Sequence, residues 1–410
     1  MLACAANGPT MTRGRVYLAT ALLLAALVPA VLLTSGDGRK LPRYVEGAPA
    51  SLAPFTMDYY DFLAGNPFEG DRLWMWTAAG TNAHNYLYDL EHRTIMGELI
   101  GGSPVLYDRQ NSRVLVMIGS EPVRTANDKM QNFLSRISHG APIPGSRRLE
   151  TYAMLDLRNN ASTKTGKTTQ IAREGSTWNS SPDARYGFTT PTTTMGSSFV
   201  LCDLASGKFT EIRESGSPVG WWTDHEILIV SGTNEFDLFD VGPRRRRTLF
   251  SQAYVKTFLE QERIADVATN LWAFPNWNGR SYDFYLGSAE SWGGRQHPDS
   301  FLLKADKANA ALKLVYRNFR FRWGAHLDST ATHYLYPGES GVPGSGGDGS
   351  IYLENLTNGT ILTVVPPDNQ GQYSTPAFYG DEVIYFRNRM LWRAQINGSN
   401  NTVLLPNKGQ

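Results

Sequence analysis

Residues 199–212 read FVLCDLASGKFTEI, an apolar run that passes through a polar turn containing Asp and Gly into a second short run. Short runs rich in β-branched and aromatic residues on both sides of such a turn predict two antiparallel strands joined by a tight hairpin. A single small sheet cannot bury both of its faces, so we expect related units elsewhere in the chain.

The same pattern recurs along the chain, with units starting at residues 86, 152, 199, 236, 301, 351 and 391. The spacing is close to that of propeller blades, which is about 40–50 residues, with insertions in the second and fifth units. We therefore expect an all-β protein, a seven-bladed β-propeller of four-stranded antiparallel blades, with an N-terminal apolar helix. An irregular β-sandwich and a ring of six or eight units remain alternatives.

Composition agrees with this fold class. The 410 residues include 39 Gly and 22 Pro, which separate short apolar and aromatic segments, and helical spacing is limited to residues 252–268 and, more weakly, 129–137. The net charge is +1, so the chain lacks the global electrostatic footprint of a nucleic-acid-binding protein. Cys4 and Cys202 are the two cysteines, and we expect no structural disulfide, with Cys202 buried as a small apolar side chain.

The N-terminal region contains an uncharged run of 18 residues, Val16 to Leu33, preceded by Arg13 and Arg15. We interpret residues 1–34 as a signal anchor or signal peptide, residues 35–53 as a linker and residues 54–410 as the propeller. The lack of a small-x-small cleavage site directly after Leu33 favours a retained, single-pass anchor with the propeller outside the cytoplasm. A cleaved segment predicts a secreted or periplasmic protein.

Two units resemble the TolB-like β-propeller repeat, whose pattern is Trp-Ser-Pro-Asp-Gly followed by a hairpin with Asp and Gly. Residues 178–188, WNSSPDARYGF, followed by 202–208, CDLASGK, form the better copy, and residues 375–386, TPAFYGDEVIYF, followed by 396–399, INGS, form the weaker one. Ala184 stands where the repeat has its turn glycine. The resemblance implies an extracytoplasmic propeller that works with other proteins, since such propellers commonly serve as binding platforms. It assigns no catalytic residue.

Several catalytic signatures are missing from the sequence. There is no Gly-x-Ser-x-Gly elbow, no His-Glu-x-x-His and no Cys-x-x-Cys, and the Gly166-Lys-Thr stretch lacks the first glycine of a phosphate loop. We therefore predict no catalytic residue, metal site or cofactor. His297, His326 and His333 are the histidines best placed to meet near one rim, and a polysaccharide lyase with a divalent ion held by histidines at a propeller centre keeps an enzymatic alternative open.

Aromatic, Arg and His residues are densest between Leu271 and His326. Flat apolar rings beside forked donors can stack on sugar rings or anchor a peptide. Trp221, Trp222 and His225 are possible additions, and the alternative interpretation is that these aromatics fill gaps between blades. Our candidate ligand-binding residues are Trp272, Trp277, Arg280, Trp292, Arg295, His297, Trp323 and His326.

The run Arg244 to Arg247 is expected in a hairpin, as a solvated edge or as a contact for anionic headgroups. Taken together, the patterns favour a non-catalytic platform that binds a protein or glycan ligand at its loop face, is attached to a membrane through its N-terminal segment and does not bind nucleic acid. The alternatives are a carbohydrate-active lyase or hydrolase with its site at the propeller channel, and a structural module of an envelope assembly.

Overall fold

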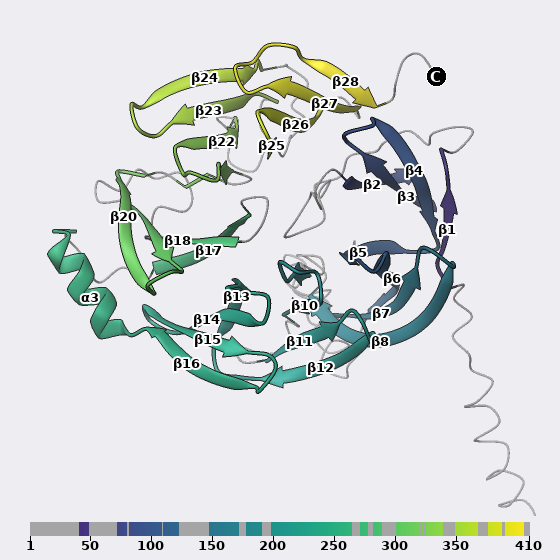
Figure 1. Ribbon diagram of the computed structural model, residues 1–410, viewed down its shortest axis with the longest axis horizontal. Coiled ribbons are helices and arrows are strands. Elements are labelled where there is room, and N and C mark those ends of the chain that lie inside the picture. The colour runs from purple at the N-terminus through teal and green to yellow at the C-terminus, as the bar shows by residue number, and fades with distance from the viewer. Residues whose placement is uncertain are drawn as a thin grey trace, which may run out of the picture. The chain divides into compact units, whose positions relative to one another are not determined.

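A computed structural model shows seven four-stranded antiparallel sheets arranged around a common centre, so the chain is a seven-bladed β-propeller (Figure 1). This confirms the predicted fold class and blade count, and excludes the sandwich and the rings of six or eight units. The structure describes residues 41–48, 72–79, 82–108, 110–122, 147–171, 178–190, 198–264, 271–277, 282–288, 301–319, 321–322, 325–338, 349–367, 376–387 and 390–405.

Blades are numbered along the chain. Blade 1 contains β1 (Arg43–Glu46), β2 (Arg72–Ala79), β3 (Asn82–Asp89) and β4 (Thr94–Ile100). Blade 2 contains β5 (Ser103–Asp108), β6 (Arg113–Pro122), β7 (Arg147–Asp156) and β8 (Ala161–Ile171). Blade 3 contains β9 (Asn179–Ser180), β10 (Tyr186–Thr189), β11 (Ser198–Asp203) and β12 (Lys208–Arg213). Blade 4 contains β13 (Ser217–Trp221), β14 (Glu226–Gly232), β15 (Glu235–Asp240) and β16 (Arg245–Phe250).

Blade 5 contains β17 (Leu271–Trp277), β18 (Tyr282–Ser288), β19 (Phe301–Asp306) and β20 (Ala311–Arg317). Blade 6 contains β21 (His326–Leu327), β22 (His333–Pro337), β23 (Ile351–Asn355) and β24 (Thr360–Val365). Blade 7 contains β25 (Ala377–Tyr379), β26 (Glu382–Arg387), β27 (Met390–Gln395) and β28 (Thr402–Leu405). The helix α3 (Gln252–Gln261) lies between blades 4 and 5 and confirms the helix predicted within residues 252–268. Residues 129–137, where a second helix was predicted, lie outside the described residues.

In six of the seven predicted hairpins a carboxylate or amide at the end of one strand accepts a hydrogen bond from the turn, and in blade 7 Asn397 accepts one from within the turn. In β11–β12 the Asp203 carboxylate accepts from the N–H of Ala205 at 2.9 Å, and Gly207 takes a positive φ of 67°. Asp240 and Asp306 do the same in blades 4 and 5. Such turns fix the register of the strands that they join.

The turn of the TolB-like copy is built around Ser181, whose Oγ accepts from the N–H of Tyr186 at 2.9 Å and donates to Asp183 at 2.7 Å. Ala184 occupies the glycine position with a positive φ of 55°. Blade 6 repeats this turn with Asp328 in place of Ser181 and Ala331 at φ 56°. The repeat geometry therefore extends to a blade in which the sequence motif is absent.

The edge strand of blade 1 comes from the segment expected to be a linker. Arg43–Glu46 pairs with β4, and Asn160 in the β7–β8 turn of blade 2 exchanges two hydrogen bonds with the backbone of Tyr44, at 2.7 and 2.8 Å. The sheet structure therefore begins before the expected domain start at residue 54. The apolar run 16–33 lies outside the described residues, and within them no helix is long and apolar enough to cross a membrane.

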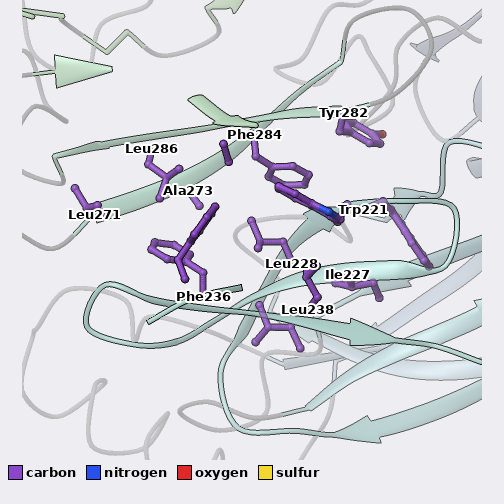
Figure 2. Close-up of a cluster of buried hydrophobic side chains, with 14 of the residues drawn as sticks. Trp221, Ile227, Leu228, Phe236, Leu238, Leu271, Ala273, Tyr282, Phe284 and Leu286 are labelled. Atoms are coloured by element: carbon purple, nitrogen blue, oxygen red, sulfur yellow. The ribbon is translucent and has the colours of Figure 1, made fainter. Parts of the chain in front are cut away.

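Apolar side chains from both faces of each sheet form the core between neighbouring blades. The largest cluster joins blades 3, 4 and 5 and includes Val255 and Leu259 of α3 (Figure 2). Blades 1 and 7 share no strand in the described structure, and their junction is a cluster in which Tyr86 and Tyr88 pack with Ile384 and Leu391. Cys202 is fully buried in the junction of blades 2 and 3, as predicted, and burial raises the pKa of its thiol.

Two buried tyrosines provide a test of this packing. The hydroxyl of Tyr88 has no hydrogen-bond partner, whereas the hydroxyl of Tyr385 donates to Asn401 at 2.9 Å. An unsatisfied buried hydroxyl costs free energy, while a satisfied one contributes about 1 kcal/mol. We expect Tyr88→Phe to leave the free energy of unfolding in urea unchanged or raised by up to about 1 kcal/mol, and Tyr385→Phe to lower it by about 1 kcal/mol. Equal losses in the two variants would contradict this assignment.

Candidate functional site

Strand β17 presents Trp272 to solvent at the inner side of blade 5. Its neighbours Leu271 and Ala273 are buried against blade 4 (Figure 2), while Trp272, on the other face of the strand, is 51% exposed. Successive residues of a strand point to opposite faces, so burial of residues 271 and 273 fixes the direction of residue 272. Trp272 is therefore an exposed aromatic ring on a rigid strand.

The chain segment that connects blade 5 to blade 6 packs next to the residues that pair with Trp272. Gly287 is the register partner of Trp272 on β18, and a Cβ at this position would lie 2.1 Å from the ring of Phe321. Phe321 also packs edge-on against Phe274, with 4.9 Å between ring centroids. Only glycine leaves room for the Phe321 ring, which is buried as a wedge between the two blades.

Arg322 follows Phe321 in the segment that connects blade 5 to blade 6, and its side chain is partly exposed. Its guanidinium carbon lies 4.1 Å from the ring centroid of Tyr336, and its backbone N–H donates to the hydroxyl of Tyr334 at 2.8 Å. A guanidinium stacked on a ring is held in place and keeps its charge. In the sequence FRFR (319–322) both phenylalanines are buried, while Arg322 is partly exposed. Arg322 is not among the ligand-binding residues predicted from the sequence.

His326 lies on β21, the short first strand of blade 6. The next residue, Leu327, is tied to blade 5 through Asn276, which donates to its carbonyl at 3.0 Å and accepts from its N–H at 3.2 Å. Burial lowers the pKa of His326 from 6.5 to about 4, so its imidazole is neutral at neutral pH. A neutral imidazole can accept or donate a hydrogen bond to a ligand without adding charge to the site.

The other predicted residues do not converge with Trp272 in the described structure. Trp277 pairs with Tyr282 at the opposite end of β17 from Trp272, roughly 17 Å away at the usual rise per residue. Leu327 is bonded to Asn276, the neighbour of Trp277, so His326 also lies toward that end of β17. Arg280, Trp292, Arg295, His297 and Trp323, as well as the side chain of Trp277, lie outside the described residues. The candidate site that can be described at the Trp272 end therefore consists of Trp272 and Arg322.

Other sequence candidates have structural roles. Trp221 and Trp222 are buried between blades, and the indole N–H of Trp221 donates to the carbonyl of Asn179 at 2.8 Å. These two residues therefore fill gaps between blades, which was the alternative to ligand binding. His333 lies 3.0 Å from Asp328 in its own turn, and no group of three metal-ligating side chains occurs among the described residues.

The arginine run is divided between solvent and ion pairs. Arg244 lies exposed in the β15–β16 turn, with a positive φ of 55°. Arg246 is bound to the buried Asp237, and Arg247 donates to Glu226 at 2.7 Å. Arg244, Arg245 and Arg247 are thus exposed, as expected for a solvated edge, whereas Arg246 is partly buried and bound within blade 4.

Comparison with known proteins adds information on the fold alone. No protein-family model matches the chain, and no curated protein matches it. A solved structure of oligogalacturonate lyase in complex with manganese is 13% identical, covering 82% of this chain and 89% of its own, with a TM-score of 0.46.

Two further solved structures are similar at the same level. The β-propeller domain of the Trilobed protease from Pyrococcus furiosus is 11% identical over 85% of this chain and 97% of its own, with a TM-score of 0.47. TolB from Acinetobacter baumannii is 16% identical over 80% and 77%, with a TM-score of 0.34. TolB and other propeller proteins are thus among the structures that this seven-bladed chain resembles.

The depressed pKa of His326 predicts a specific pH dependence. The unfolded chain binds a proton at His326 below pH 6.5, whereas the folded chain binds it only below about 4, so stability is lost as the pH falls through this window. Between pH 7 and 4 we expect the free energy of unfolding of His326→Gln to fall by about 1 to 3 kcal/mol less than that of the wild type. Urea unfolding at a series of pH values measures this difference. His225→Gln, which changes an exposed histidine, is the control. Parallel pH profiles for wild type and His326→Gln would contradict the assignment.

Proposed function

We propose that the chain is a membrane-anchored, extracytoplasmic propeller that binds a protein or glycan ligand at the junction of blades 5 and 6. The observation that carries this proposal is the exposure of Trp272 on a strand whose flanking residues Leu271 and Ala273 are held in the core. Large exposed aromatic rings on rigid elements are the usual anchors of binding surfaces.

The neighbouring polar groups support the same conclusion. Arg322 supplies a fixed set of donors beside the Phe321 ring that packs on Gly287, the register partner of Trp272, so an apolar face and directional hydrogen bonds lie at the same junction of blades. His326 adds a neutral ring toward the other end of β17. This combination suits a sugar ring, which has apolar C–H faces and a rim of hydroxyls. A peptide with an aromatic or acidic residue is the alternative ligand.

Substitution of Trp272 tests the proposal. The full-length protein in detergent is applied to an array of neutral and acidic oligosaccharides, and cross-linking in its native membrane followed by mass spectrometry reports protein partners. Loss of a buried aromatic anchor typically costs 2 kcal/mol or more. We therefore expect Trp272→Ala to weaken the captured ligand by about 30-fold or more.

Ile361→Ala is the matched control, because Ile361 is 57% exposed on the outer strand of blade 6 and away from this site. Unchanged capture by Trp272→Ala would contradict the proposal. Turnover of an oligosaccharide into smaller products would instead favour the alternative, a carbohydrate-active lyase or hydrolase.

The cellular location is a separate part of the proposal and rests on the apolar run 16–33. We expect protease added to cells with an intact cytoplasmic membrane, and with any outer membrane removed, to digest the propeller, and deletion of residues 16–33 to leave it protected inside. The mass of the mature N-terminus distinguishes a retained anchor from a cleaved signal. Protection of the wild-type propeller in such cells would contradict an extracytoplasmic location.

A further inference from the structure

The outer strands of blades 6 and 7 lack the charged residues that the other blades carry at this position. The outer strands of blades 1 to 5 each contain at least two charged side chains, such as Lys164 and Lys167 in β8. The outer strands β24 and β28 read TILTVV and TVLL and contain none. Charges on an edge strand prevent it from pairing with the edge of another molecule, so blades 6 and 7 are without this protection.

Strand β24 presents an apolar edge to solvent. Ile361 and Leu362 are 57% and 41% exposed, and as neighbours in a strand they point to opposite faces of the sheet. Thr360 and Thr363 on either side of them are exposed as well. Four consecutive exposed residues without a charge form an edge to which another strand can add.

Each of these two uncharged strands follows a turn that contains an acceptor motif for N-linked glycosylation. The β23–β24 turn runs through Asn358-Gly-Thr and the β27–β28 turn through Asn397-Gly-Ser, and Asn-x-Ser/Thr is the acceptor motif. The second turn also lies against β24, since a Cβ on Gly398 would be 3.1 Å from the carbonyl oxygen of Thr363. The two motifs therefore lie at both ends of the exposed stretch of blade 6.

The two asparagines are exposed, and the fold uses only the oxygen of each side-chain amide. Asn358 Oδ1 accepts a hydrogen bond from the hydroxyl of Thr360 at 2.7 Å, and Asn397 Oδ1 accepts one from the hydroxyl of Ser399 at 2.6 Å. Within the described part of the chain neither Nδ2 donates a hydrogen bond. A sugar attached to this nitrogen therefore displaces no contact of the folded protein.

The other acceptor motifs in the described structure are less suitable. The Nδ2 of Asn160 donates to the backbone of β1 at 2.8 Å, so a glycan there would stand in the contact that holds β1. Asn179 is half-buried on β9. The motifs that begin at Asn355 and Asn400 lie in the same two turns as Asn358 and Asn397 and add no further location.

We propose that Asn358 and Asn397 carry N-linked glycans and that these glycans shield the uncharged edge of blade 6. A glycan is bulky and strongly hydrated, so one at each end of the exposed stretch keeps a foreign strand away, as charged residues do in blades 1 to 5. The proposal rests on the extracytoplasmic location proposed above, because the transfer of the glycan takes place outside the cytoplasm.

The transfer itself needs no group of this protein beyond the asparagine. The donor is a lipid-linked oligosaccharide diphosphate: the amide nitrogen forms a bond to the anomeric carbon, the bond from that carbon to the diphosphate oxygen breaks, and one amide proton is released. No oxidant or reductant is involved. Because the transfer commonly precedes folding, the folded structure decides which modified asparagines are tolerated, and Asn358 and Asn397 are the ones whose amide nitrogen faces no neighbour.

Peptide mass spectrometry of the full-length chain from its native host tests the modification. An Asn-Ser-Thr tag in a flexible extension of the C-terminus is the internal reference, and release of the glycans by peptide N-glycosidase in heavy-oxygen water converts each modified asparagine to a labelled aspartate. We expect the label at Asn358, at Asn397 and in the tag, and none at Asn160 and Asn179.

A chain with a modified tag but no glycan at Asn358 or at Asn397 would overturn the proposal. A tag without a glycan would overturn it as well. The protease experiment described above then shows whether the location is wrong or only the modification.

The double variant Asn358→Gln/Asn397→Gln tests the shielding. Sedimentation velocity of the full-length protein in detergent should show a fraction of dimers and larger species raised by about threefold or more, because the edge of β24 is bare. Addition of Leu362→Lys, which places a charge on this edge, should reverse the rise. Asn309→Gln is the matched control, since Asn309 is exposed in the β19–β20 turn and belongs to no acceptor motif. Unchanged self-association of the double variant, or a rise that Leu362→Lys does not reverse, would overturn the shielding role.

Discussion

A four-stranded blade has two apolar faces and can bury neither within itself, and the rest of this structure depends on that constraint. On β18 the alternation is direct, since Phe284 belongs to the core shared with blade 4 and Tyr285 to the core shared with blade 6. Each blade must therefore be covered on both sides, and a closed ring is the arrangement that leaves no face uncovered. The junction of blades 1 and 7 obeys the same rule through side-chain packing, without an exchanged strand in the described structure.

Apolar contact holds blades together but does not fix their register, because it has no direction. Buried polar groups supply the direction. Asn276 joins β17 to β21 through two backbone hydrogen bonds, and Asn234 accepts from the N–H of Leu271 at 2.7 Å. These amides set the start of β17 and the position of β21, which are the two strands that carry Trp272 and His326. The packing of the ring and the geometry of the candidate site thus depend on the same few bonds.

The repeat pattern was sufficient to predict the blades, because an Asp or Asn ends the third strand in blades 1 to 6 and Asn397 lies in the corresponding turn of blade 7, each accepting a hydrogen bond from that turn. It did not predict β1, since Arg43–Glu46 has no hairpin partner nearby in sequence and is held by β4 and by Asn160, which lie far along the chain. The site was predicted in part for a related reason. Trp272 and Trp277 are close in sequence, but a strand carries them to opposite ends of the blade.

The two ends of the blades differ in what they can vary. In blades 2 to 7 the turns between the first and second strands and between the third and fourth are short, and side-chain hydrogen bonds hold several of them, as at Ser181, Asp203 and Asp328. Connections at the other end are free to lengthen, as residues 123–146 and 289–300 do between the second and third strands of blades 2 and 5. Length is therefore the variable on the face of Trp272, which suits recognition of a large ligand. On the turn face the short connections leave the identity of single residues as the main variable, because a longer turn would lose the hydrogen bonds that fix the strand register.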